Sequence, residues 1–190
     1  MALLFCAAPP ALLGLAVALP DWRTERVTYD SQLYSTRWQR AAATTSGPPL
    51  LCLPPIGVGI SRSFFDPLHR EWAALGAPCD LHSPELLGNG DASPKPRRFY
   101  SPDVWAEQLL DYQRRKIGRP AVLVVQGGLL PVALEMWRAA GPDAIAGVSL
   151  CSPPPLRFIS PEVIKKRKAL ISRLLYVETR AYVGYLMGRI

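Results

Sequence analysis

Histidine is the scarcest catalytic side chain in this sequence, and both copies come early. Among 190 residues the only two are His69 and His82. The four cysteines form no C-x-x-C pair and lie far apart, at Cys6, Cys52, Cys79 and Cys151. That spacing argues against a zinc site or a redox motif, and neither a phosphate-binding loop nor a dinucleotide fingerprint is present. We therefore expect no cofactor, no metal and no required disulfide.

What is abundant is apolar sequence. The chain is 49% hydrophobic and 19% charged, which is typical of a globular protein and long enough for one domain with a sizeable core. Cys52 and Cys151 fall inside apolar runs, where a thiol usually behaves as a small core residue. Most of the net charge of +7 comes from residues 156–190, which carry eight basic and two acidic side chains.

The most informative stretch covers residues 120–135 and reads PAVLVVQGGLLPVALE. Residues 121–125 are a continuous apolar run bounded by proline and glycine, which predicts a strand buried on both faces. Gly127 and Gly128 then allow a tight turn, because glycine adopts positive φ at little cost. Pro131 suits the first turn of a helix. The pattern predicts a strand, a sharp turn and a helix.

The rest of residues 21–155 alternates predicted strands and helices. Two short antiparallel strands are expected before residue 43, and buried strands over residues 50–53, 79–82 and 144–151. Helices are expected over residues 66–75, capped by Asp66, and from Ser101, also a cap, to Gly118. Because later strands alternate with helices, we expect an α/β fold with a mostly parallel sheet.

The predicted turn resembles the nucleophile elbow of the α/β-hydrolase superfamily, which reads G-x-S-x-G between a strand and a helix. Laid on that motif, VQGGL at residues 125–129 puts Gly127 in the serine position. PPIGVGIS, at residues 54–61, stands where the superfamily has a loop that donates an oxyanion N–H. PELLGNGD, at residues 84–91, resembles a D-x-x-G-x-G-x-S stretch, with Glu85 at the aspartate.

The resemblance implies a partial α/β-hydrolase fold, truncated after the sixth strand of an eight-strand plan. The resemblance covers residues 21–155. Within the superfamily, the sequence is similar to chloroplast or cyanobacterial hydrolase-like proteins with PPIGVGIS and VVQG motifs, and this similarity implies a plastid location. Residues 156–190 form a basic amphipathic segment where the family inserts a helical cap. Residues 1–20 are an apolar extension or targeting segment, with an A-x-A pattern whose cleavage is left open.

Family membership implies ester, thioester or related acyl hydrolysis, but the residues do not support it. The superfamily orders its triad as nucleophile, acid and histidine. Gly127 has no side-chain atom that could attack, and both histidines precede it. Ser152 is a weak substitute, beside Cys151, although a turn hydroxyl is its commoner role. Two hypotheses stay open: a pseudoenzyme that binds a ligand or partner, and an acyl hydrolase whose chain is incomplete here.

The candidate ligand-binding residues are the glycines of the two loops and the glutamine before the elbow, namely Gly57, Gly59, Gln126, Gly127 and Gly128. Pro54 and Pro55 cannot donate to an oxyanion because proline has no N–H. The expected partners are a small apolar or acyl ligand, a protein at an open sheet edge, and a membrane surface touched by residues 163–190. The basic segment lacks the aromatic interleaving of a nucleic-acid reader, which argues against nucleic-acid binding.

Overall fold

Six strands form one sheet in the computed structural model, which describes residues 22–42, 47–57, 60–92 and 100–152. In chain order the strands are β1 (Trp22–Tyr29), β2 (Gln32–Gln39), β3 (Leu50–Leu53), β4 (Leu81–Pro84), β5 (Ala121–Gln126) and β6 (Ile145–Cys151). Their order across the sheet is β1-β2-β4-β3-β5-β6. The last four positions are mutually parallel, whereas β1 and β2 are antiparallel to their neighbours. The predicted mostly parallel sheet is confirmed.

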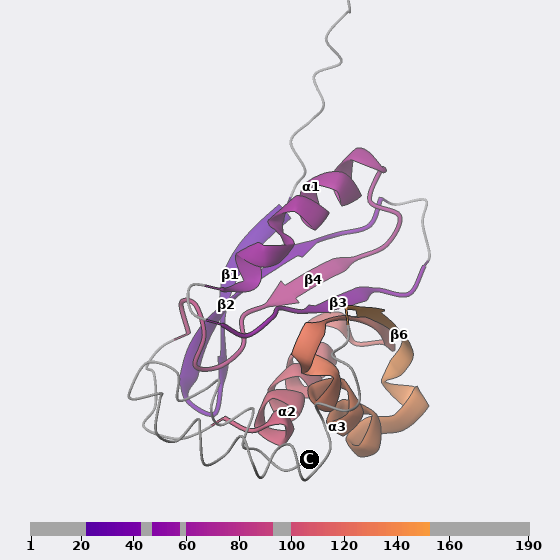
Figure 1. Ribbon diagram of the computed structural model, residues 1–190. Helices are drawn as coiled ribbons and strands as arrows, with labels where there is room; N and C mark the ends of the chain where they lie inside the picture. Colours follow the sequence, from indigo (N-terminus) through magenta and orange to yellow (C-terminus); the bar gives the residue numbers. More distant parts are fainter. Residues whose placement is uncertain (1–21, 43–46, 58–59, 93–99, 153–190) are drawn as a thin grey trace, which may run out of the picture.

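Helices cover both faces of this sheet. Helix α1 (Asp66–Ala74) lies on one face, and α2 (Pro102–Tyr112) and α3 (Leu130–Ala140) lie together on the other (Figure 1). The larger core fills the space under α2 and α3, where Trp105, Leu109 and Tyr112 of α2 are fully buried. A smaller cluster of Cys52, Phe65 and Leu81 packs under α1.

Backbone chemistry explains where several elements end. The β1–β2 hairpin turns at Asp30 and Ser31, which both have positive φ, as a two-residue hairpin loop requires. A π-helical turn (Gln113–Ile117) continues α2, and Gly118 ends it in the left-handed conformation at φ +70°. Because glycine has no Cβ, it adopts this conformation at little cost.

Some local predictions were wrong. Asp66 does not cap α1, because a 3₁₀ turn (Arg62–Phe65) precedes it, and the hydroxyl of Ser61 caps that turn instead. Asp66 forms an ion pair with Arg37. Ser101 precedes α2 as predicted, but its side chain makes no capping hydrogen bond.

Two strand predictions also need correction. The strand expected over residues 79–82 begins two residues later, as β4, after Cys79 and Asp80 have formed a bend. Cys151 is exposed rather than part of the core, because β6 is the last strand of the described sheet. Cys52 is buried as expected. The N-terminal extension (1–20) and the cap-like segment (156–190) lie outside the described residues.

Within the described ranges, no helix combines the length and hydropathy needed to cross a bilayer.

Candidate functional site

The corner between β5 and α3 has the geometry of the predicted elbow. β5 ends at Gln126, a 3₁₀ turn (Gly127–Leu129) follows, and α3 begins at Leu130. Gly127 has a φ of +55°, which side-chain-bearing residues adopt only with strain. A Cβ added there would meet no heavy atom of the described residues within 4 Å. The corner therefore combines the sharp turn of a nucleophile elbow with space for a side chain, but it carries none.

The strand register places the loops beside this corner. Leu53 pairs with Val125 and Gln126 pairs with Cys151, so the loop that begins at Pro54, and Ser152 after β6, lie next to the elbow. Carboxyl ends of parallel strands meet at one edge, which is where open α/β sheets bind ligands. The structure thus brings most sequence-predicted positions to one edge. Gly59 lies outside the described residues.

These positions differ in exposure. Gly57, Gln126, Gly127 and Gly128 are half-buried. Ser152 is exposed and has a φ of +51°, an unusual conformation for a serine. The hydrogen bonds of both imidazoles go to residues of β4 or α2, and neither goes to Ser152.

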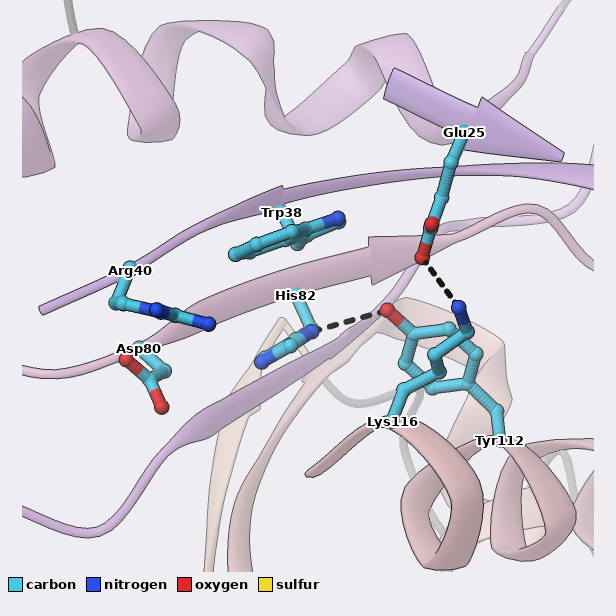
Figure 2. A pocket seen from close by; sticks show the side chains of 7 residues that line it. All are labelled: Glu25, Trp38, Arg40, Asp80, His82, Tyr112 and Lys116. Carbon is cyan, nitrogen blue, oxygen red and sulfur yellow. Dashed lines mark hydrogen bonds and ion pairs between the residues drawn. The ribbon is translucent and has the colours of Figure 1, made fainter. Parts of the chain in front are cut away.

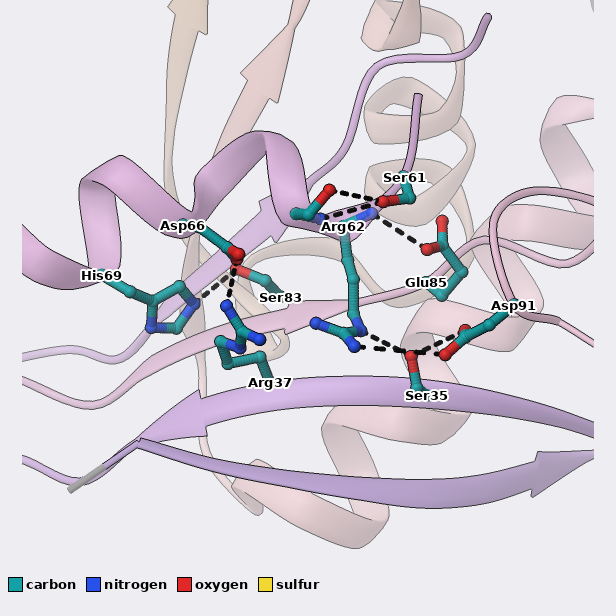
Figure 3. Close-up of polar contacts among 10 residues, drawn as sticks. Ser35, Arg37, Ser61, Arg62, Asp66, His69, Ser83, Glu85 and Asp91 are labelled. Atoms are coloured by element: carbon teal, nitrogen blue, oxygen red, sulfur yellow. Dashed lines mark hydrogen bonds and ion pairs between the residues drawn. The ribbon is translucent and has the colours of Figure 1, made fainter. Parts of the chain in front are cut away.

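A partly buried polar network, drawn in Figure 3, fixes the loop after β3 to the loop after β4. Oε2 of Glu85 accepts a hydrogen bond of 2.9 Å from the backbone N–H of Arg62. Nε of Arg62 donates to Oγ of Ser35 at 2.5 Å, and Ser35 donates to Oδ1 of Asp91 at 2.7 Å. The network holds the segment that follows the glycine loop in place relative to the sheet.

Gly90, in the glycine motif after β4, leaves room for the carboxylate of Glu85. Gly90 has a φ of +51°, and a Cβ added there would lie 2.1 Å from Oε2 of Glu85. Such a contact is impossible without movement of buried atoms. Sequence reasoning found PELLGNGD as a motif, but the contact between Gly90 and Glu85 is decided by the fold of the loop.

Burial changes the acidity of Glu85. Its side chain is almost fully buried, and Oε1 has no hydrogen-bond partner in the described structure. Loss of hydration raises the pKa of Glu85 to about 7, although the N–H of Arg62 partly opposes this effect. Glu85 is therefore poised to change charge near neutral pH, a property that its sequence position alone did not indicate.

The first histidine forms a serine–histidine pair on the α1 side of the sheet. Nε2 of His69 lies 2.9 Å from Oγ of Ser83, and both residues are fully buried between α1 and β4 (Figure 3). Burial lowers the pKa of His69 to about 4, which makes it a weak base. The pair is therefore enclosed in the core, where its hydrogen bond joins α1 to β4.

No family model and no curated protein matches this chain by sequence. Comparison with solved structures finds similar folds. The chain resembles wild-type Cfl2 from Burkholderia cenocepacia with a TM-score of 0.58 at 16% identity, covering 80% of this chain and 55% of that protein.

Two other solved structures extend the likeness to different enzymes. A thermophilic esterase from Thermogutta terrifontis gives a TM-score of 0.55 at 20% identity, covering 79% of this chain and 53% of the esterase. The haloalkane dehalogenase DatA from Agrobacterium tumefaciens gives a TM-score of 0.54 at 21% identity, covering 78% of this chain and 48% of the dehalogenase. The chain thus spans about half the length of these structures, and at such identities the likeness shows the fold alone. The described part of the chain has a partial α/β-hydrolase fold.

Proposed function

We propose that this chain is a non-catalytic protein of α/β-hydrolase fold that binds a small apolar or acyl ligand, or a protein partner, at the carboxyl edge of its sheet. The observation that carries the proposal is the elbow itself. Its backbone keeps a φ of +55°, which would strain a residue with a side chain, but Gly127 offers no atom that could attack a carbonyl.

The substitutes for a nucleophile do not complete a catalytic site. Acyl transfer needs a nucleophile, a base within hydrogen-bond reach and donors for the oxyanion. Ser152 and Cys151 are exposed at the end of β6, with no imidazole bonded to either. The arrangement supports binding of a ligand without a subsequent covalent step.

Groups suited to binding remain at this edge. The amide of Gln126 can orient a carbonyl, and the backbone of Gly57 and Gly128 can donate N–H groups. The contact between Glu85 and Arg62 keeps the loop after β3 fixed, which reduces the entropy lost when a ligand binds. We infer that the ligand has an acyl or amide oxygen and an apolar body.

The test of inactivity is an esterase assay of the full chain with p-nitrophenyl acetate, butyrate and octanoate. We expect hydrolysis at the rate of buffer alone, and the same rate for Ser152→Ala and Cys151→Ala. Ser149→Ala, which removes an exposed hydroxyl from the same strand, is the control. Turnover by the wild-type chain that is lost in Ser152→Ala or Cys151→Ala, but kept in Ser149→Ala, would show a catalytic site and overturn the proposal.

The test of binding uses octanamide, an acyl amide that is not readily hydrolysed. We expect it to raise the thermal midpoint of the wild-type chain in proportion to ligand occupancy. Gln126→Ala should abolish most of this rise, because the amide that orients the carbonyl is lost. An unchanged midpoint at saturating octanamide would contradict an acyl ligand at this edge.

A second candidate, an acyl hydrolase whose chain is incomplete here, is favoured by the open side of β6. Val148 is 46% exposed and Leu150 is 45% exposed, although both are large apolar residues on a strand. A native protein of greater intact mass, with an aspartate and a histidine downstream, would support this candidate. Even then a residue other than Gly127 would have to supply the nucleophile.

Three further properties remain proposals that rest on sequence. They are a plastid location, a protein partner at the open β6 edge, and contact of residues 163–190 with a membrane surface. Flotation of the full chain with anionic liposomes tests the last, and absence of binding would remove it. Import of the full-length precursor into isolated plastids tests the first.

A further inference from the structure

A cavity of about 180 Å³ lies away from the elbow, where β2 and β4 meet the end of α2 (Figure 2). Asp80 lines it immediately before β4 begins, and Arg40 lines it immediately after β2 ends. β4 and β5 run in the same direction, so this cavity borders the amino edge of the parallel strands, whereas the elbow borders their carboxyl edge. The candidate site described above does not use any of its lining residues.

A hydrogen-bond chain ends at His82 in the cavity wall. Oγ1 of Thr36 donates to Oη of Tyr112 at 2.9 Å, and Oη lies 2.9 Å from Nδ1 of His82. Tyr112 accepts from Thr36 and keeps a proton of its own, which it can donate to Nδ1. In that arrangement Nδ1 is the acceptor, and the imidazole carries its proton on Nε2.

The Nε2–H group has nothing to bond in the described structure. His82 is only 5% exposed, and its ring stacks on Trp38 with centroids 6.2 Å apart. Figure 2 shows Nε2 pointing away from Tyr112, toward the side of the cavity where Arg40 and Asp80 lie. Burial lowers the pKa of His82 to about 4, so at neutral pH the ring is an uncharged donor. An N–H donor that faces the cavity without a protein partner is available to a ligand that accepts a hydrogen bond there.

Among the charged residues that line the cavity, one cation has no carboxylate partner within the described structure. Lys116 pairs with Glu25 at 2.9 Å, and Asp80 pairs with Arg119 at 3.3 Å. The other oxygen of Asp80 accepts the backbone N–H of Ala41 at 2.7 Å. Within the described residues, Arg40 has no carboxylate partner.

Arg40 is instead held by an aromatic ring. Its guanidinium carbon lies 5.7 Å from the centre of the Trp38 ring, on whose ring system His82 also stacks. Stacking on an aromatic face orients a guanidinium without using its N–H donors. Its donors therefore remain free to bind an anion together with Nε2–H of His82.

We propose that this cavity binds a small carboxylate, which accepts hydrogen bonds from the guanidinium of Arg40 and from Nε2–H of His82. The two acids in the wall are already neutralised by Lys116 and Arg119, so a carboxylate meets the unpaired charge of Arg40 rather than a net negative site. A volume of about 180 Å³ is below the range of drug-sized pockets, which limits the ligand to a fragment such as a short-chain or single-ring acid.

The scarcity of histidine makes a direct test possible. The full chain is labelled with ¹⁵N-histidine, which gives two imidazoles, His82 at the cavity and His69 as an internal control. Sodium benzoate is the probe, at constant ionic strength. We expect a saturable change in the Nε2 signal of His82, no change at His69, and no saturable change with benzamide, which has the same shape but no charge.

Variants separate a site from general anion contact. Arg40→Gln should weaken benzoate binding about tenfold, because it removes a charge-assisted pair. Arg70→Gln removes an exposed arginine of α1 and should leave the affinity unchanged. Tyr112→Phe removes the donor to Nδ1, so the spectrum of the free protein should show a mixture of His82 tautomers.

Three outcomes would overturn the proposal. The first is a linear, non-saturating response of His82, and the second is an equal response of His69. The third is equal affinity of the wild-type chain and Arg40→Gln for benzoate, with both well folded by amide dispersion. None of these results bears on ester hydrolysis or on octanamide binding at the elbow, so this proposal and the proposed function fail independently.

Discussion

Oγ of Ser83 and Nε2 of His69 are hydrogen-bonded at 2.9 Å, and neither residue reaches the surface of the molecule. In an exposed cleft this contact would indicate a nucleophile and its base. Here the pair lies between β4 and α1, so a substrate cannot reach the hydroxyl. The contact is therefore part of the core and does not restore the chemistry that Gly127 lacks.

Ser83→Ala should destabilise the fold by about 1–3 kcal/mol without changing any esterase reading. The reason is that Nε2 of His69 loses its partner, while Nδ1 already has none in the described structure. Urea denaturation measures the effect, with exposed Ser149→Ala as the matched control. Equal midpoints for the two variants would show that the buried hydrogen bond contributes nothing.

Gly90→Ala should be much more damaging than Gly118→Ala. Both glycines have positive φ, which costs an alanine about 1 kcal/mol. A Cβ at Gly90 would also lie 2.1 Å from Oε2 of Glu85, whereas one at Gly118 meets no atom of the described residues within 4 Å. We expect an additional loss of about 1–3 kcal/mol at Gly90, measured by urea denaturation. Similar losses at both positions would mean that the loop shifts freely away from Glu85.

Gly127→Ser should fold but should not hydrolyse esters. The new side chain has open space around its Cβ, so the cost is the backbone strain of about 1 kcal/mol. A serine at the corner still lacks a bonded imidazole, and p-nitrophenyl butyrate should be hydrolysed no faster than in buffer.

Gly118→Ser carries the same backbone strain away from the elbow and is the control for that variant. Rapid ester turnover that appears in Gly127→Ser and not in Gly118→Ser would mean that a functioning base lies near the corner. In that case the incomplete-hydrolase reading would replace the proposed one.

Glu85→Gln should change how stability depends on pH. The pKa of Glu85 rises from an ordinary 4.5 in the unfolded chain to about 7 in the fold. The folded state therefore binds more protons between these values, and this group's contribution to stability falls as pH rises from about 4.5 to 7. Above pH 7 the buried charge costs at most about 3 kcal/mol. Glutamine cannot ionise, so the variant should gain stability relative to wild type across that window.

His69 and His82 act in the opposite direction in the same range, because their pKa values are lowered from 6.5 to about 4. Their effect is common to wild type and Glu85→Gln, so the difference between the two denaturation free energies at pH 5 and pH 8 isolates Glu85. Glu71→Gln, on an exposed position of α1, controls for the loss of one carboxylate. A difference that is the same at both pH values would place the pKa of Glu85 near its ordinary value.

The elements with a strong periodic or apolar signal were predictable, but their polar contacts were not. Residues 121–125 and the glycines after them predicted the strand and the corner, and both were confirmed. The assignment of Asp66 as a cap failed because it relied on local preference, whereas the side chain pairs with Arg37 from a distant strand. Likewise, the sequence around His82 did not indicate that its Nδ1 would form a hydrogen bond with Tyr112, 30 residues later.

The order of apolar runs, prolines and glycines was enough to determine the alternating strands and helices and the glycine at the elbow, because these depend on backbone freedom and on burial of short segments. Only the tertiary structure determined which polar groups are buried in the core and which face a cavity. Burial raised the pKa of Glu85, removed Ser83 and His69 from solvent, and left Nε2–H of His82 facing open space beside Arg40. Such effects arise from atoms brought together by the sheet order, which places β4 between β2 and β3.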